Sequence, residues 1–505
     1  MLLSNLSNNL FMILKNPSYI IRKAISIGLL SAVLIPAGCK KEFLDVDPQG
    51  QQPVVQFWTT QEHAVNAVNA MYGNLRGWTN VAFAAIAVES MGSDEAEKGS
   101  SPGDSDYMNN YSNFTHTATE GQTLDFWKGQ YQNINFANQV LTNVPGISMD
   151  ETLKTRLLAE AKFVRGYSYF RLVRAFGDVP LRLTIPEGAE EYNIPRAPKA
   201  EVYAAIEKDL SEAAAVLPVS YGSTDIGRAT KGAALGMHAK VSMYQGKWQQ
   251  VLDLTNQVMA LGYDLFPDYE KLFRVENENN IESVFEIQAT YVPGNCDMSN
   301  SQYSQVQGVR GQRGGGWGFN VPTQELVEAY EPGDPRRDAT ILFRGETTPQ
   351  GDLIPPVGDN PRYNQKSYVP FSRYVECSEG SEQNIRVLRF AEILLMNAEA
   401  ANELDNAQQA LQSLNRVRER ARGNNPNILP DVTTTDKAEL RTAIWHERRV
   451  ELAMEYDRFF DVIRQGRGEE VFGPRGFTAG KNELMPIPQQ EIDLSAGVLT
   501  QNPGY

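Results

Sequence analysis

Carboxylates at helical spacing are the first residues in this chain that could carry out chemistry. Glu447, Glu451 and Glu455 fall four residues apart near the C-terminus, and Arg458 follows them. A second polar stripe, in a mostly apolar segment, consists of Arg389, Glu392, Glu399 and Glu403. Two carboxylates about 5–10 Å apart in a cleft are the catalytic pair of a glycoside hydrolase. The spacing therefore makes hydrolysis of a glycosidic bond one hypothesis.

Arginines nearby in the sequence favour a structural role for the same carboxylates. Like charges four residues apart on a helix repel each other unless cations neutralise them. The arginines expected to face them are Arg165, Arg171, Arg416, Arg448 and Arg449. We therefore interpret the glutamates as partners in ion pairs between helices, with catalysis as the alternative.

Other catalytic motifs are missing from the sequence. It contains no nucleophile elbow, and the glycines of residues 314–318 lack the strand and helix that flank a phosphate-binding loop. The pair His446-Glu447 lacks the second histidine of a zinc protease motif. The sequence predicts no catalytic residue, no metal site and no cofactor.

Composition and charge restrict the class of ligand. The 505 residues carry a formal charge of −15, with 22% charged and 10% aromatic residues, as in folded proteins. Without residues 1–38, 44 basic and 62 acidic residues remain, a charge of −18. This balance repels nucleic acid and anionic membranes, so we expect a neutral ligand and no nucleic acid.

The N-terminus reads as a secretory signal. Arg22-Lys23 precedes the apolar run 24–35, which is too short to span a bilayer, and Pro36-Ala37-Gly38 leads to Cys39. We predict a signal peptide over 1–38, starting at Met1 or Met12, and a lipid on Cys39. The other cysteines, Cys296 and Cys377, could form a disulfide or stay free.

Helices are predicted throughout the rest of the chain, around the segment 159–181. This segment is apolar on nearly all sides, Gly166 indicates a close helix crossing, and Gly177 ends it. The expected helices are 58–72, 127–140, 159–177, 201–217, 230–244, 249–261, 389–404 and 407–421. Trp127 lies on a helical stripe and is expected in the core.

Loops and short strands fill the remaining segments. Residues 74–122 are rich in Gly, Ser, Asn and Asp, and residues 291–382 are rich in Gly, Pro, Gln and Ser, so we expect loops in both ranges. The best strand candidates are 283–288 and 385–388. The predicted fold class is mainly α: a scaffold of helical hairpins with a long loop-rich region and few short strands.

Several segments together resemble the SusD/RagB family of outer-membrane lipoproteins. They include AEAKFVRGYSYFRLVRAFGDVPL at 159–181, together with 228–248, 321–341, 389–404 and 444–464, and they span nearly the whole mature chain. The resemblance implies one helical domain over 39–505 built on tetratricopeptide-like hairpins. Its N-terminal half would be 39–274 and its C-terminal half 275–505, which contains the loop-rich 291–382.

The resemblance also implies a function and a region for the site. Such proteins bind glycans at the cell surface and deliver them to a TonB-dependent outer-membrane transporter. Loop aromatics could stack on sugar rings, with polar neighbours bonding the hydroxyls. The candidate ligand-binding residues are Trp78, Arg76, Asn80, Asp94, Tyr107, Tyr291, Tyr303, Gln312, Arg313 and Trp317.

We expect capture of an oligosaccharide or polysaccharide without catalysis, by a protein held at the outer membrane through Cys39. Two alternatives remain: a lipid-anchored glycoside hydrolase and a peptide-binding import component.

Overall fold

Long helices dominate the computed structural model, which describes residues 57–188, 191–292, 300–311, 316–373 and 380–505. The compact unit begins at Thr59. Its long helices are α4 (Gln61–Leu75), α8 (Gly121–Asn143), α9 (Glu151–Phe176), α10 (Lys199–Val216), α11 (Lys231–Met243), α12 (Trp248–Met259), α16 (Phe390–Glu403), α17 (Ala407–Arg422) and α18 (Lys437–Glu451). The predicted signal peptide, Cys39, Cys296 and Cys377 lie outside the described residues.

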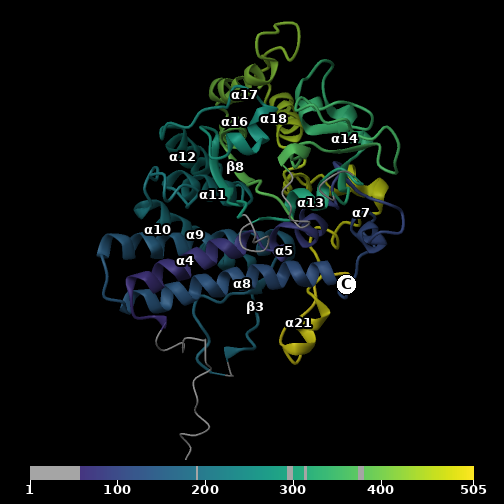
Figure 1. The fold of residues 1–505 in the computed structure, drawn as a ribbon. Helices are drawn as coiled ribbons and strands as arrows, with labels where there is room; N and C mark the ends of the chain where they lie inside the picture. Colours follow the sequence, from purple (N-terminus) through teal and green to yellow (C-terminus); the bar gives the residue numbers. More distant parts are fainter. Residues whose placement is uncertain (1–56, 189–190, 293–299, 312–315, 374–379) are drawn as a thin grey trace, which may run out of the picture. The chain divides into compact units, whose positions relative to one another are not determined.

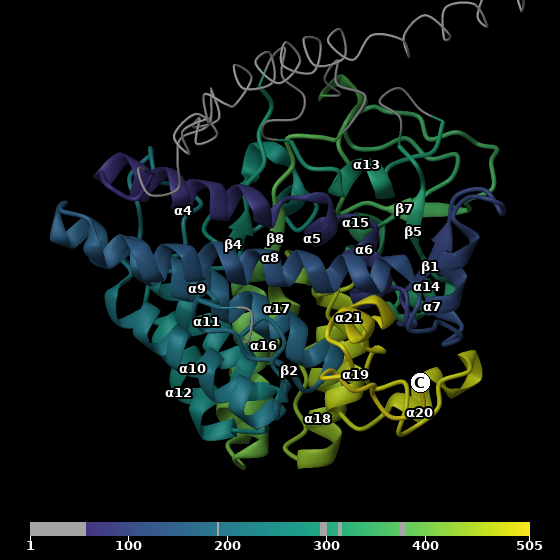
Figure 2. The same cartoon turned by 90° about the horizontal axis from the view of Figure 1, so that it is seen from below.

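The long helices pack largely in chain order (Figures 1 and 2). Helix α8 packs on α9, α9 on α10, α10 on α11, and α11 on α12. Helix α12 then packs on α16, which in turn contacts α17 and α18, so the loop-rich segment is inserted between α12 and α16. The predicted fold class, mainly α with few short strands, is confirmed.

Helix α9 occupies the position predicted for the central helix. Asp150 caps its first turn by accepting a hydrogen bond from the backbone N–H of Leu153. A Cβ on Gly166 would lie 3.2 Å from the Cγ of Leu210 on α10, which confirms the predicted close crossing. Gly177 ends the helix with φ +72°.

The strands form four antiparallel pairs within the described residues. They are β1 (Ala96–Gly99) with β5 (Phe319–Pro322), β2 (Val179–Pro180) with β3 (Arg196–Ala197), β4 (Ser283–Ile287) with β8 (Ile385–Arg389), and β6 (Ile341–Phe343) with β7 (Arg362–Asn364). The two strands predicted from sequence, β4 and β8, pair with each other. The β1–β5 pair joins the N-terminal half to the loop-rich segment.

The prediction of loops over 74–122 was wrong for much of that range. It contains α5 (Trp78–Val81), α6 (Phe83–Ala85), the π-helical turn Ile86–Ser90 and α7 (Asn109–Ser112). The apolar stretch 81–88 is buried, and this burial favours helical turns despite the polar flanks.

Short elements also occur in the second loop-rich range and near the C-terminus. They are α13 (Tyr303–Gln307), α14 (Gln324–Ala329), α15 (Arg336–Thr340), α19 (Arg458–Arg464), α20 (Gly468–Phe472) and α21 (Gln489–Leu494). None of the helices in the described part of the chain combines the length and the hydropathy that a transmembrane span needs.

Candidate functional site

Two partly exposed tryptophans from distant parts of the sequence meet on the surface. The ring centroids of Trp78 and Trp317 are 5.9 Å apart, and both rings contact Phe83, at 5.4 and 5.8 Å. Phe83 packs edge-on against Phe319 of β5 at 4.7 Å. We call Trp78, Trp317, Phe83 and Phe319 the aromatic cluster. Phe83 and Phe319 are buried, whereas Trp78 and Trp317 each leave part of the indole ring open to solvent.

Helix α5 positions Trp78 because α5 is fixed to α8. The buried Asn80 side chain accepts hydrogen bonds from Gln130 and Asn133 of α8, both at 2.9 Å. Gly129 of α8 allows the close approach, since a Cβ there would lie 2.7 Å from the Thr79 Oγ1. Trp78 therefore stands on a short helix with little freedom to move.

A tight glycine turn positions Trp317. Its backbone N–H donates to the carbonyl of Gln305 at 2.9 Å. Gly318 has φ +73°, and its carbonyl accepts from the Ser100 N–H at 2.7 Å and from the Asn360 side chain at 2.8 Å. The sequence left open a mobile or a tightly turned loop, and residues 316–318 are tightly turned.

An ion pair that the sequence did not reveal lies beside Trp317. Arg310 binds Asp104 at 2.6 Å and also donates to the Ser100 hydroxyl and to the Trp317 carbonyl. Lys98 stands 5.7 Å from the centre of the Phe319 ring. These residues come from segments about 200 positions apart, which the β1–β5 pairing and the backbone bond from Ser100 to Gly318 bring together. They supply polar groups next to the open indoles.

Three candidate residues are buried in the scaffold. Asn80 bonds α8 as described above, and Tyr303 packs against Tyr456. Asp94 is 3% exposed and binds Arg458 and Arg449, both at 2.7 Å. Burial alone would raise the pKa of Asp94, but the hydrogen bond and charge of Arg458 and the charge of Arg449 lower it. These three side chains stabilise the fold and are closed to a ligand in this structure.

The remaining candidates are at or near the surface. Tyr107 is exposed and its hydroxyl accepts a hydrogen bond from Gln122 at 3.2 Å. Tyr291 is partly exposed, as is Arg76, which donates to the Gly73 carbonyl at 2.9 Å. Gln312 and Arg313 lie outside the described residues. The described ring contacts join Trp78 to Trp317 but not to Tyr107 or Tyr291.

The carboxylates considered for catalysis are held in ion pairs. Glu447 and Glu451 are fully buried on α18, and both contact Arg336, at 2.5 and 3.1 Å. Glu451 also binds Arg389 and Arg420. Burial would raise the pKa of Glu451, but the surrounding arginines lower it well below its usual range. Such a carboxylate stays ionised and has no open side for a substrate.

Two details of the carboxylate prediction were wrong. Glu455 lies beyond the end of α18, so it does not share a helical stripe with Glu451, although it also pairs with Arg389. Most of the expected arginines bind other acids: Arg165 binds Asp209, Arg171 binds Glu89, Arg416 binds Asp264 and Arg449 binds Asp94. Only Arg448 contacts a named glutamate, Glu392.

The described residues give little support for metal binding. Across the described ranges, no group of three or more His, Cys, Asp and Glu side chains is placed to hold a metal ion. Aromatic stacking and hydrogen bonding are the chemistry that the aromatic cluster offers.

Comparison with known proteins agrees with this fold. A profile of the SusD family matches residues 281–505, and a second profile, described as starch-binding and associating with the outer membrane, matches residues 42–243. The chain is 28% identical to SusD-like protein P2 of Formosa agariphila, over 96% of this chain and 100% of that protein.

Solved structures give the same result. A laminarin-binding SusD-like protein is 31% identical, with a TM-score of 0.78 over 88% of this chain and 100% of that one. A SusD-like protein of Bacteroides fragilis is 27% identical, with a TM-score of 0.75 over 89% and 98% of the two chains. The chain belongs to the SusD family.

Proposed function

We propose that this protein binds a carbohydrate chain at the aromatic cluster and does not alter it chemically. The contact between Trp78 and Trp317 carries the proposal, because two fixed and partly open indoles offer apolar faces to sugar rings. Arg310 and Asp104 lie beside Trp317 and supply hydrogen-bonding groups for hydroxyls. The related laminarin-binding structure supports a carbohydrate as the ligand.

We further propose that the protein works at the outer membrane. The predicted lipid on Cys39 would hold it at the cell surface, and one matching family profile is described as associating with the outer membrane. There it would pass captured glycan to a TonB-dependent transporter, as the family resemblance implies. The fully buried, arginine-bound Glu447 and Glu451 argue against a glycoside hydrolase.

A binding and release assay tests the proposed function. The form that begins at residue 40 keeps the compact unit, which starts at Thr59, and would be incubated with laminarin, starch and peptide mixtures. We expect retention of one polysaccharide with no new reducing ends. Release of reducing ends would establish the hydrolase instead. Retention of peptides alone would establish the import component that binds peptides.

A further inference from the structure

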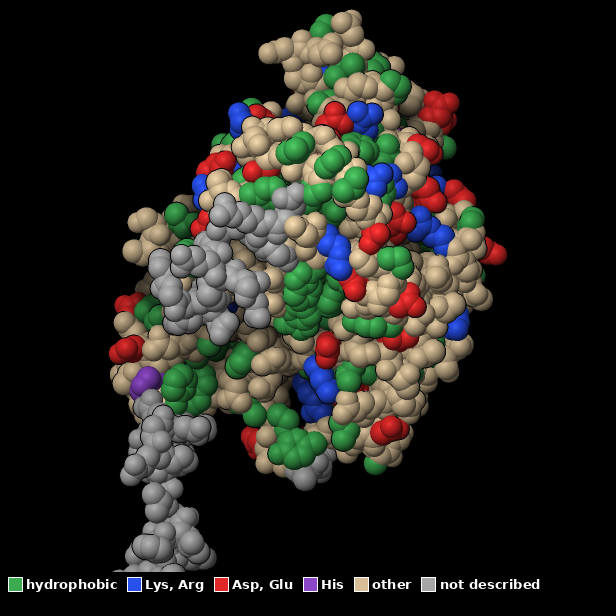
Figure 3. Space-filling view, turned by 45° about the vertical axis from the view of Figure 1, so that its right-hand side comes forward, with side chains coloured by type: hydrophobic (Ala, Val, Ile, Leu, Met, Phe, Trp, Pro, Cys, Tyr) green, Lys and Arg blue, Asp and Glu red, His purple; other side chains and the backbone are tan. Residues whose placement is uncertain are grey.

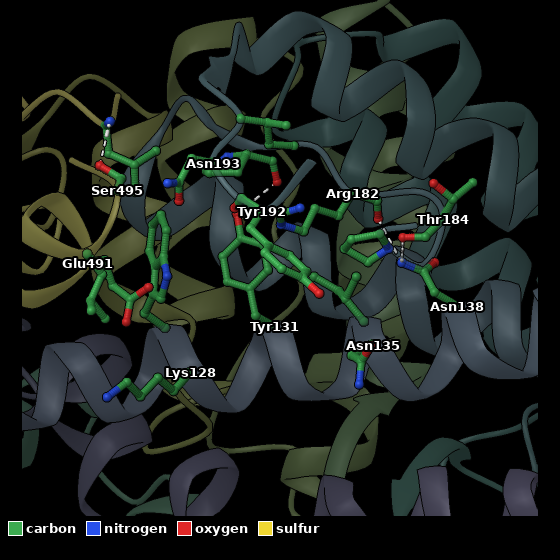
Figure 4. A pocket seen from close by; sticks show the side chains of 17 residues that line it. Lys128, Tyr131, Asn135, Asn138, Arg182, Thr184, Tyr192, Asn193, Glu491 and Ser495 are labelled. Carbon is green, nitrogen blue, oxygen red and sulfur yellow. Dashed lines mark hydrogen bonds between the residues drawn. The ribbon is translucent and has the colours of Figure 1, made fainter. Parts of the chain in front are cut away.

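A hollow lies between α8, residues 180–186 and 192–194, and α21 (Figure 4). Its volume is about 320 Å³, within the range of roughly 300–1,000 Å³ that small ligands occupy in proteins. We call it the α8–α21 cleft. Trp127, which was expected in the core, forms one wall together with Tyr131 and Asn138 of α8.

Two aromatic rings on α8 are rigid parts of this wall. Trp127 is 3% exposed and packs edge-on against Phe176, with ring centroids 5.0 Å apart. The Tyr131 ring is 5.0 Å from Trp127, and its hydroxyl donates to the Pro180 carbonyl at 2.8 Å. Their orientation is therefore set before any ligand arrives, which lowers the entropic cost of binding.

A third aromatic residue stands opposite and is open to solvent. Tyr192 is 62% exposed, so its ring is accessible to a ligand. Its backbone is nevertheless held, because the Arg182 guanidinium donates to the carbonyls of Glu191 and Tyr192. The structure thus presents an exposed ring at the edge of the cleft on a bonded backbone.

Three polar side chains that line the α8–α21 cleft are available to bond a ligand. Among the described residues, Asn135, Asn193 and Glu491 make no side-chain hydrogen bond or ion pair. By contrast, Asn138 donates to the carbonyls of Arg182 and Thr184, and Lys128 donates to Gln490. Two amides and a carboxylate near aromatic faces provide the donors and acceptors that sugar hydroxyls need.

The α8–α21 cleft is separate from the aromatic cluster because the two lie on opposite faces of α8. Residues 127, 131 and 135 follow one helical stripe into the cleft. Gly129 and Asn133 occupy the opposite stripe and contact α5, which carries Trp78. The cleft and the aromatic cluster are therefore on different sides of the same helix.

We propose that the α8–α21 cleft is a second saccharide-binding site, in which Tyr192 and Tyr131 contact sugar rings and Asn135, Asn193 and Glu491 bond hydroxyls. The saccharide class of the ligand rests on the proposed function. When one segment of a long polysaccharide is bound at the aromatic cluster, its other segments are held at a high effective concentration near the cleft. A second weak site on the same protein therefore raises retention of the polymer. Short oligosaccharides do not receive this benefit.

The test removes the aromatic cluster first. In a Trp78→Ala/Trp317→Ala background, binding of laminarihexaose and maltohexaose at millimolar concentration is followed by saturation-transfer NMR. We expect residual binding of one hexaose, at least fivefold weaker after Tyr192→Ala and retained after Tyr192→Phe, which keeps the ring. Val357→Ala, an exposed change outside the cleft, serves as the control and should leave binding unchanged.

A second measurement covers failure of the double variant to fold. Native mass spectrometry of the chain without substitutions should show two hexaoses bound at saturation, and after Tyr192→Ala the second should require at least fivefold more hexaose. One hexaose in both proteins would overturn the second site and leave the proposed function standing. Binding of neither hexaose to either protein would overturn both proposals for these sugars. Loss of all binding in the Tyr192→Ala variant would show that the main site is the α8–α21 cleft and not the aromatic cluster.

Discussion

The glycines on either side of Trp317 set the orientation of its side chain. A Cβ on Gly316 would lie 2.5 Å from the backbone carbon of Gly308, and one on Gly318 would lie 2.6 Å from the Asn360 amide. Gly318 also has a positive φ, which side chains disfavour. The indole is therefore presented by a turn that tolerates no side chain at these positions.

Glu95 is a buried acid whose titration links stability to pH. Burial, opposed by Arg458, raises the pKa of Glu95 from 4.5 to about 7, and the Met454 N–H is its hydrogen-bond donor. A raised carboxyl pKa stabilises the fold below pH 4.5, and that contribution is lost as pH rises to about 7. The loss is on the order of 3 kcal/mol at 1.36 kcal/mol per pKa unit.

Replacing Glu95 with glutamine should therefore reduce the fall in stability between pH 5 and pH 8. The amide oxygen still accepts from Met454 but does not ionise. Urea unfolding of both proteins at the two pH values measures the difference. A stability difference that stays constant with pH would show that Glu95 does not titrate in this range.

At the scale of elements, the contact between α5 and α8 places Trp78. Gly129→Ala should push α5 away, because the new Cβ meets both the side chain and the carbonyl of Thr79 within 3.1 Å. We expect a loss of about 1–3 kcal/mol in the free energy of unfolding. Carbohydrate affinity should fall at least threefold, as measured by calorimetry.

Gly121→Ala is the matched control on the same helix. A Cβ at Gly121 meets nothing within 4 Å, so stability and affinity should stay unchanged. Equal effects of the two substitutions would mean that general helix properties, and not the contact with Thr79, explain the result.

The elements that could be predicted from the sequence are those whose apolar pattern and end residues lie within the element itself. Helices α9, α10 and α11 show apolar periodicity and end signals within their own residues, and each was found within a few residues of its true bounds, except for the start of α9. Helix α5 and strand β1 have four residues each and form through contacts with α8 and β5. Trp78 and Trp317 were both candidates, but no local pattern shows that they touch.

Across the whole molecule, buried charge pairs hold the C-terminal half together. Glu451 on α18 reaches Arg336 from the loop-rich segment, Arg389 before α16 and Arg420 on α17. Acidic and basic side chains on the face drawn in Figure 3 are interspersed, as on ordinary soluble surfaces. The buried pairs, and not the surface pairs, are therefore expected to matter for stability.

Glu451→Gln should destabilise the protein by about 3–5 kcal/mol, because three buried arginines lose a shared partner. Denaturant unfolding at pH 7 measures the loss. Glu151→Gln, at an exposed pair with Lys154, is the control and should change little. A similarly small effect at Glu451 would show that the buried network contributes no net stability.

Calorimetric titration of the retained polysaccharide into Trp78→Ala and Trp317→Ala is the most direct test of the aromatic cluster. We predict at least a tenfold loss of affinity in each variant, about 1.4 kcal/mol, without unfolding. Trp248→Ala, a partly buried tryptophan at the start of α12, should bind as the parent does. Unchanged affinity in both Trp78→Ala and Trp317→Ala would contradict the assignment of the aromatic cluster as the carbohydrate site.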